Sequence, residues 1–128
     1  MDTFIAQAKY LRVSPKKIRV LVAAIKKMRL TEALTVLSHH REKGSKYLEK
    51  VILSSIANAR SQHNLTKENL FIKDIILTQG PVFKRMLPVA RGTGHQYKKR
   101  TCHLKVVLAQ IKSVTSKKAA EKEMKIEN

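Results

Sequence analysis

A basic stretch, residues 82–100, has glycines near its middle and lies between two segments rich in β-forming residues. The preceding segment is Leu70–Thr78, and the following one, Thr101–Ile111, alternates in hydropathy. Alternation places one set of side chains on a single face of a strand, here Cys102, Leu104, Val106 and Leu108. We therefore predict a long β-hairpin in which residues of about 82–100 form an arm that projects roughly 25–30 Å from the body, at about 3.4 Å per residue.

Turn-forming residues support this hairpin. Gly92 and Gly94 are expected to supply the positive φ of a tight reversal, and Gly80-Pro81 is expected to punctuate the chain before the arm. An isolated two-stranded ribbon is marginally stable in water, so a partner must hold it. Two alternatives follow: an arm inserted into folded RNA, or a flexible surface loop. The length of the stretch and its lack of acidic residues favour the arm.

The first half of the chain has the periodicity of helices. Ser14-Pro15 is a typical helix start, and apolar residues follow it at helical spacing, namely Ile18, Leu21, Val22 and Ile25. We expect Thr31 to cap a second, short helix that contains Leu34 and Leu37. Gly44-Ser45 is expected to mark the end of that helix and the start of a third.

The third predicted helix is the longest and ends near Gln62-His63-Asn64. Its apolar stripe consists of Leu48, Val51, Ile52, Ser55, Ile56 and Ala59. With a strand over Phe4–Val13, these elements predict an α+β fold: three helices packed on a small antiparallel sheet of about three strands, with a long protruding β-hairpin arm. We expect residues 1–112 to form one domain and residues 113–128 to form a polar tail that is disordered or a frayed helix.

The 27 Lys and Arg residues outnumber the 9 Asp and Glu residues, for a formal charge of +18. This charge is unevenly distributed, because residues 79–112 contain eight basic residues and no acidic one. Residues 3–31 are also free of acids. Ordinary soluble surfaces mix both signs, so two long acid-free stretches indicate surfaces that face phosphates. Nucleic acid is the favoured partner, with a membrane surface or an acidic protein as alternatives.

Other features limit the compartment and the chemistry. The sequence has no apolar run long enough to span a bilayer and does not begin with a typical signal peptide, so a soluble, cytoplasmic protein is expected. The single cysteine, Cys102, cannot form an internal disulfide and lacks the spacing of a zinc site. We therefore expect a reducing compartment, no metal and no cofactor.

Several short motifs occur together along the chain. They are Ala8-Lys9-Tyr10-Leu11-Arg12-Val13-Ser14-Pro15-Lys16-Lys17, Ser55-Ile56-Ala57-Asn58-Ala59, Gly80-Pro81, Lys84-Arg85, Pro88, Ala90-Arg91-Gly92 and Lys99-Arg100-Thr101. In this order and spacing, over about residues 6–111, the chain resembles the bacterial-type ribosomal protein twenty-two family of the large subunit.

The resemblance implies a structural protein and not an enzyme. Its body would sit on large-subunit (23S-type) ribosomal RNA and aid assembly, and the tip of its arm would line the nascent-peptide exit tunnel. The implied partners are that RNA, neighbouring large-subunit proteins and the nascent polypeptide, with no membrane and no homo-oligomer. The location would be a cytoplasmic bacterial ribosome or an organelle ribosome.

Transferred to this chain, the motifs imply two sets of site residues. The expected RNA-binding residues are Lys9, Arg12, Lys16, Lys17, Arg19, Lys84, Arg85, Arg91, Lys98, Lys99 and Arg100. Apart from the motifs, His95 is a further RNA-binding candidate, because its ring can stack on or hydrogen-bond to RNA. The expected tunnel-lining tip is Val89, Ala90, Arg91, Gly92, Thr93 and Gly94. The tip departs from the family, because Val89 and Thr93 stand where arginine is usual and Gly94 where alanine is usual. This tip is therefore less basic than is typical.

Other functions have weaker support. Cys102 and His103 are neighbours in a predicted strand, so their side chains should point to opposite faces and form no catalytic dyad. A DNA-architectural protein with basic β-arms is the main alternative, but such arms usually insert an apolar wedge at the tip. Binding to a membrane surface would need bulky apolar anchors that the first helix lacks. Tyr97 is a candidate to stack on a base or to pack against its own strand.

Overall fold

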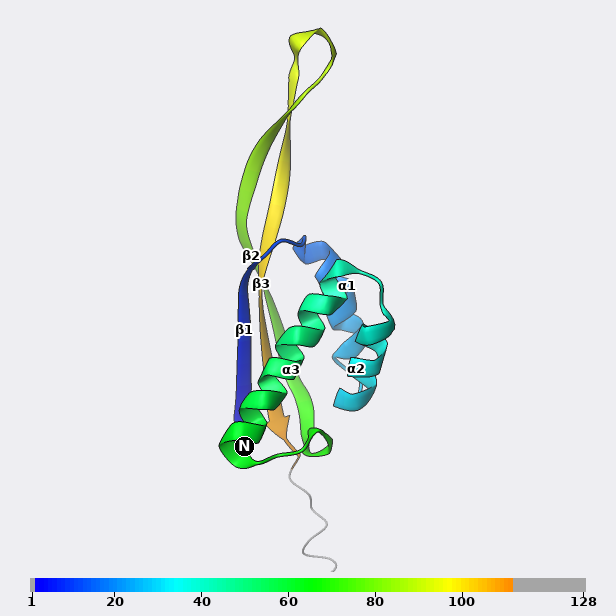
Figure 1. Cartoon of the computed structure of the whole chain (residues 1–128), viewed down its shortest axis with the longest axis vertical. Coiled ribbons are helices and arrows are strands. Elements are labelled where there is room, and N and C mark those ends of the chain that lie inside the picture. Colours follow the sequence, from blue (N-terminus) through cyan, green and yellow to red (C-terminus); the bar gives the residue numbers. More distant parts are fainter. Residues whose placement is uncertain (1, 112–128) are drawn as a thin grey trace, which may run out of the picture.

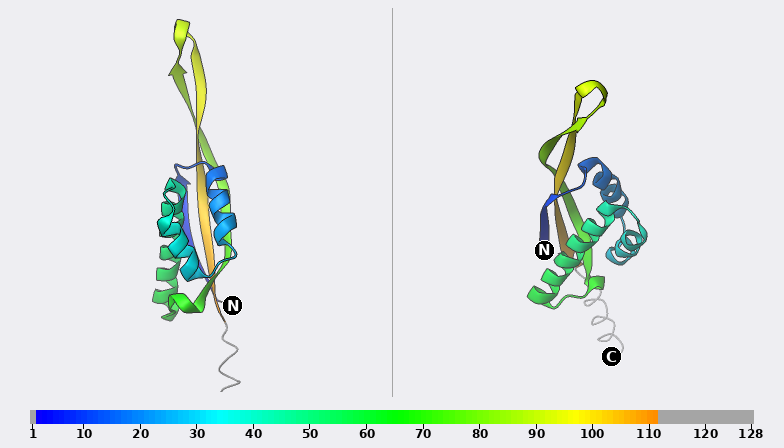
Figure 2. Two further views of the ribbon diagram at one scale, coloured as in Figure 1. Left: turned by 90° about the vertical axis from the view of Figure 1, so that its right-hand side faces the viewer. Right: turned by 45° about the horizontal axis from the view of Figure 1, so that its top comes forward.

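The computed structural model describes residues 2–111 as two layers, a three-stranded sheet and three helices on one of its faces (Figures 1 and 2). The strands are β1 (Thr3–Leu11), β2 (Leu70–Pro88) and β3 (Gly94–Gln110), and the helices are α1 (Pro15–Ile25), α2 (Leu30–His39) and α3 (Lys43–His63). Short 3-10 turns occur at η1 (Lys67–Asn69) and η2 (Ala90–Gly92). The sheet is antiparallel in the order β1-β3-β2. The predicted α+β fold is confirmed; the predicted tail, 113–128, lies outside the described residues.

The core lies between the helices and the inner face of the sheet. All four alternating residues predicted for β3 are fully buried, and so are Phe4, Ile18, Leu48 and Ile52. Every residue of the stripe predicted for α3 is buried. The buried side chains therefore recur at the predicted periods, 3.6 residues in the helices and two in the strands, and their burial stabilises these elements.

Helix α3 is also hydrogen-bonded to the sheet by two polar side chains of the Ser55–Ala59 motif. Ser55 Oγ donates to the Phe4 carbonyl oxygen at 3.0 Å, and Asn58 Nδ2 donates to the Ile5 carbonyl oxygen at 3.0 Å. Ser55 is fully buried, so its hydroxyl needs such a partner. This motif therefore positions α3 against β1, an edge strand of the sheet.

Two predicted helix boundaries were wrong. Helix α2 begins at Leu30, not after a Thr31 cap, because the buried Leu30 anchors its first turn and Arg29 is the N-cap residue. Gly44-Ser45 lies inside the first turn of α3, and α2 already ends at His39. Gly44 is buried against α1, where an added Cβ would lie 3.2 Å from Ile18 Cγ1. Packing between helices, and not a chain reversal, therefore accounts for this glycine.

The predicted arm is a continuation of β2 and β3 beyond the body and not a separate ribbon (Figure 1). Pairing runs without a break in register from Val82–Arg100 to Pro88–Gly94. Gly80-Pro81 does not end the strand; it lies where the register shifts between Gln79 and Val82. A Cβ on Gly80 would lie 2.5 Å from Thr101 Oγ1, so this position needs a residue without a side chain.

The tip differs from the prediction in one glycine. Gly92 has a φ of +70°, as expected, but the other positive φ belongs to Arg91, at +63°, and not to Gly94. Gly94 begins β3 in an ordinary strand conformation, opposite Pro88. The Val89 amide donates to the Thr93 carbonyl oxygen at 2.8 Å and closes the tip. One glycine is therefore sufficient for the reversal, because the turn residue before it also adopts the left-handed conformation.

Candidate nucleic-acid interface

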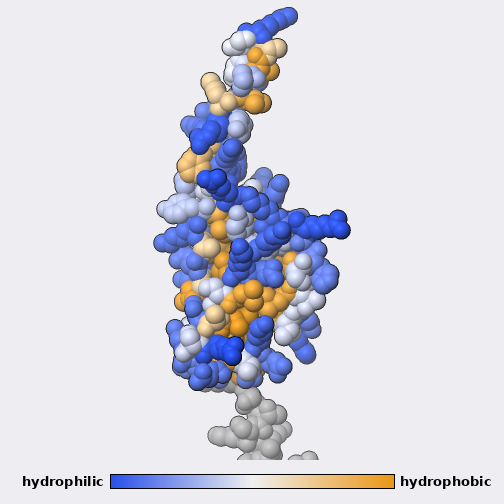
Figure 3. All heavy atoms as spheres, in the orientation of Figure 1, coloured by the Kyte–Doolittle hydropathy of each residue, from blue (hydrophilic) through white to orange (hydrophobic). Residues whose placement is uncertain are grey.

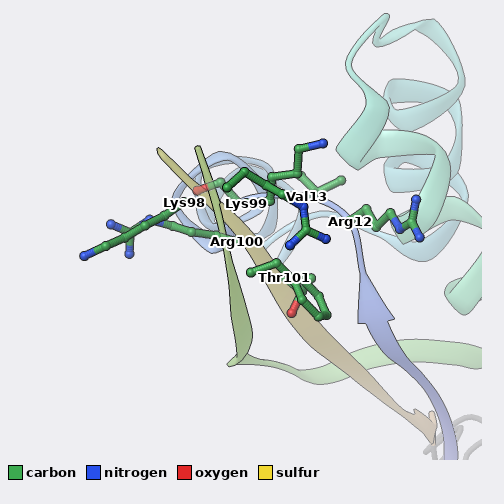
Figure 4. Close-up of a pocket in the computed structure, with 9 residues that line it drawn as sticks. Arg12, Val13, Lys98, Lys99, Arg100 and Thr101 are labelled. Carbon is green, nitrogen blue, oxygen red and sulfur yellow. The ribbon is translucent and has the colours of Figure 1, made fainter. Parts of the chain in front are cut away.

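The arm leaves the body at the end where β1 passes into α1, so the first basic motif and the arm meet there (Figure 1). A cavity of about 570 Å³ occupies this junction. It is lined by Arg12, Val13 and Ser14 after β1, by Phe83 and Arg85 of β2, and by Lys98, Lys99, Arg100 and Thr101 of β3. Figure 4 shows the labelled side chains of this cavity on the segment after β1 and on β3. Folding thus brings five predicted RNA-binding cations around one cavity.

A second cavity, of about 640 Å³, adjoins the first and shares Arg12, Val13 and Ser14 with it. Lys16, Lys17 and Lys43 add positive charge to its lining, and Glu42 adds the acidic residue. The two cavities form a basic surface that extends from the start of α1 to the root of the arm. We call this surface, defined by Arg12, Lys16, Lys17, Lys43, Arg85, Lys98, Lys99 and Arg100, the junction surface.

The remaining predicted site residues lie outside these cavities. Lys9, Arg19 and Lys84 are exposed, and Arg91 and His95 are exposed at or near the tip. All six predicted tip residues, Val89–Gly94, are exposed as well. Figure 3 shows hydrophilic side chains around the junction and a mixture of hydrophilic and hydrophobic ones along the arm. Most of the residues predicted to contact RNA or the tunnel are therefore accessible to solvent on the arm and at the junction.

No cation of the junction surface forms an ion pair within the described residues, although Glu42 lines its second cavity. Within residues 2–111 the only ion pair joins Lys26 Nζ, directly after α1, to Asp74 Oδ1 in β2 at 2.8 Å. The Lys26 hydrogen bond, followed by the Ile75 amide hydrogen bond, lowers the pKa of the Asp74 carboxyl from its ordinary value. Unpaired cations on a protruding surface attract phosphates and release their counterions on binding.

The register places aromatic and cationic side chains in alternation on one face of the arm. Phe83 pairs with Lys99, and Arg85 pairs with Tyr97. The Arg85 guanidinium carbon lies 5.8 Å from the centroid of the Phe83 ring, and Lys99 Nζ lies 5.9 Å from the centroid of the Tyr97 ring. Phe83 was not among the predicted site residues. Its signal was the same two-residue spacing of ring and cation that occurs in Tyr97-Lys98-Lys99.

The candidate catalytic residues are structural in this fold. Cys102 is fully buried, and burial raises the pKa of its thiol. His103 is partly exposed, and its Nδ1 accepts a hydrogen bond from the Tyr10 amide at 2.9 Å. In the described part of the chain no three His, Cys, Asp or Glu side chains cluster as metal ligands, and no helix is long and apolar enough to cross a membrane.

Comparison with known proteins identifies the family. The family described as ribosomal protein L22p/L17e matches residues 6–109, which include most of β1, the three helices and nearly all of the hairpin. The chain belongs to this family. Its members are structural, non-enzymatic ribosomal proteins.

Bacterial relatives match over most of their length. The large ribosomal subunit protein uL22 of Carboxydothermus hydrogenoformans is 40% identical over 107 residues, which cover 84% of this chain and 95% of the relative. The uL22 of Thermus thermophilus is 38% identical over 105 residues, covering 82% and 93%. That of Pelotomaculum thermopropionicum is 38% identical over 107 residues, covering 84% and 95%. Family membership supports the ribosomal role over the DNA-architectural one, and these relatives give the organellar alternative no support.

Proposed function

We propose that this chain is a structural component of the large ribosomal subunit that binds large-subunit ribosomal RNA through the junction surface and the arm. The observation that carries the proposal is the junction surface itself. Five cations from segments far apart in the sequence line one cavity, and the arm beside it contains no acidic residue. The lining of that cavity has no acidic residue either, so the cavity and the arm can neutralise phosphates without repelling them.

The arm adds a second part to this function. From Phe83 to Arg100 every residue is exposed, so the arm offers both of its faces to a surrounding partner. Folded RNA is such a partner, because it can enclose a narrow ribbon on several sides. We infer that the arm aids assembly by joining RNA segments, and that its tip, Val89–Gly94, reaches the wall of the nascent-peptide tunnel. Neighbouring large-subunit proteins and the nascent polypeptide are the further partners, in a cytoplasmic bacterial ribosome.

Sedimentation of a lysate that contains the tagged chain tests the ribosomal role. The chain is expected in the large-subunit fraction of a sucrose gradient, and its release is expected to rise with salt concentration. If the chain instead sediments with nucleoid DNA and is absent from the large subunit, the DNA-architectural alternative is correct.

A shortened tip separates the roles of body and arm. Deletion of residues 90–94 is expected to leave incorporation into the subunit intact, because the junction surface remains. In a cryo-EM map of the purified particle, the density for the tip in the tunnel should be lost. A complete failure of incorporation would show that the tip, and not the body, carries RNA binding.

A further inference from the structure

The two faces of the arm differ in chemistry. Side chains that pair across the ribbon, or lie two residues apart on one strand, share a face. Three consecutive pairs on one face are Phe83–Lys99, Arg85–Tyr97 and Leu87–His95. This face, which we call the ring face, carries every ring-bearing side chain of residues 82–100 except Pro88: Phe83, His95 and Tyr97. The opposite face carries Lys84 paired with Lys98 and Met86 paired with Gln96.

The two larger rings are accessible from outside. Phe83 is 46% exposed and Tyr97 is 42% exposed, although each has a cation within 6 Å of its centroid. The arm has no core in which to bury them, and an aromatic ring left in water gains no hydrophobic stabilisation. Phe83 also lines the junction cavity together with Arg12 and Arg100. An occupant of that cavity would therefore contact a ring and several cations at once.

The spacing of the rings limits what can cover them. Phe83 and Tyr97 are diagonal neighbours across the ribbon, a relation that separates residues by about 7–8 Å. Successive nucleotides along a stacked strand rise by roughly 3.4 Å, about half that distance. Two directly stacked neighbours therefore cannot cover one ring each, and the rings fit bases that are not stacked on one another. Splayed, unpaired bases are the form of RNA that aromatic side chains and guanidinium planes recognise.

We propose that the ring face binds unpaired nucleotides of RNA, with bases stacked on Phe83 and Tyr97 and with phosphates at Arg85 and Lys99. The opposite face, with Lys84 and Lys98, contacts phosphates alone. This inference rests on the proposed binding to large-subunit ribosomal RNA and adds which structural form of that RNA meets each face of the arm.

Leucine variants of the full chain test the stacking. Phe83→Leu/Tyr97→Leu keeps apolar side chains and strand geometry but removes both rings, and Met86→Leu is the matched change on the opposite face. Binding to a transcript of the complete large-subunit ribosomal RNA is measured by filter binding over a range of salt concentrations. The double variant is expected to bind roughly 10-fold or more weakly, with the same slope of log affinity against log salt, because stacking releases no counterions. Met86→Leu is expected to match the wild type.

The double variant Lys84→Ala/Lys98→Ala removes two cations of the opposite face and should change the salt dependence of binding as well as the affinity. Its affinity should fall and its salt slope should decrease in magnitude by about 1.4, the value for two phosphate contacts on a single strand. If Phe83→Leu/Tyr97→Leu binds as tightly as the wild type, the stacking inference is wrong and RNA binding by the chain stands. An equal loss in Met86→Leu would assign the effect to the ribbon's geometry and also overturn stacking. If the wild-type chain fails to bind the transcript, the proposed function fails as well.

Discussion

The body and the arm use the same two strands in opposite ways. In the body, β3 buries Cys102, Leu104, Val106 and Leu108 completely beneath the helices. In the arm, β2 and β3 pair just as regularly, but no residue from Phe83 to Arg100 is buried. Hydrophobic burial therefore stabilises the body, whereas the arm has only its backbone ladder, its attachment to the body sheet and whatever partner it binds.

This contrast shows that one hairpin can both stabilise the fold of the body and present a binding surface to a partner. The boundary between the two roles is the register shift between Gln79 and Val82. There the Thr101 hydroxyl donates to the Pro81 carbonyl oxygen at 2.7 Å, beside Gly80. A bulge of this kind bends a strand and increases its local twist, and so sets the direction in which the strand continues. The direction of the arm is therefore decided inside the body.

The largest contrast between the regions is expected in stability. Leu104→Ala removes a fully buried side chain from the central strand and should lower the free energy of unfolding by about 2–5 kcal/mol. Leu87→Ala removes the same atoms from the arm, where Leu87 is 57% exposed, and should change it by about 0.5 kcal/mol or less. Urea denaturation of both variants checks the difference. Equal losses would show that the arm is as much a part of the cooperative fold as the core.

The boundary itself should be nearly as sensitive. Gly80→Ala places a Cβ 2.5 Å from Thr101 Oγ1, so the Thr101 to Pro81 hydrogen bond must break or the strands must shift. Overpacking of this kind costs typically about 1–3 kcal/mol, to be measured by thermal or urea denaturation. Gly92→Ala at the tip is the matched control, since an added Cβ there meets nothing within 4 Å and only the φ of +70° is unfavourable. A greater loss in the control would contradict the importance of the boundary.

Binding to RNA should depend on the junction surface and not on the cations of the body. Arg12→Ala and Arg100→Ala each remove a cation of the junction surface, and each is expected to weaken binding to large-subunit ribosomal RNA about 10-fold, or about 1.4 kcal/mol, while reducing the salt slope by about 0.7–0.9. Lys26→Ala is the control, because it removes the same charge from the body at a residue already paired with Asp74. Filter binding at several salt concentrations distinguishes them. Equal effects in all three variants would mean that only total charge matters.

The smallest effect is expected from pH. Because the folded-state pKa of Asp74 lies below its ordinary value of 3.8, the ionised carboxylate stabilises the fold above that value. This contribution should disappear as pH falls below 3.8 through the folded-state pKa. This contribution is small, because the side chains of both Lys26 and Asp74 are about half exposed to solvent. Asp74→Asn should remove this part of the acid dependence; an unchanged acid profile in the variant would refute it.

Much of the fold could be predicted from local patterns. The apolar stripes of α1 and α3 and the alternation in β3 are local, because each reflects one period along one element. The start of α1 after Ser14 and the end of α3 near Asn64 were also predicted correctly. Errors occurred at Thr31, Gly44 and Gly94, where a residue type typical of caps or turns has another role. The role of Gly44 depends on its contact with Ile18, and the sequence around Gly44 does not indicate that contact.

The candidate site was predictable in its residue types but not in its grouping. The basic residues of both motifs were identified, yet the cavity that brings Arg12 beside Arg85 and Arg100 depends on how β1 ends next to β3. Phe83 was missed because a single phenylalanine in a strand is ordinary. It becomes a site residue only through its pairing with Lys99 and its position in that cavity.

The sequence alone was sufficient to predict the order and type of the elements, the positive charge of an arm without acidic residues, and the family to which the chain belongs. These properties depend on residue type and short-range period, which can be read along the chain. Tertiary structure decided that β2 and β3 continue from body into arm, that cations from distant segments share a cavity, and that the rings of Phe83, His95 and Tyr97 lie on one face. The reason is that strand register and the bulge before Val82 arise from pairing between distant residues, and a shift of one residue would move every side chain of a strand to the other face.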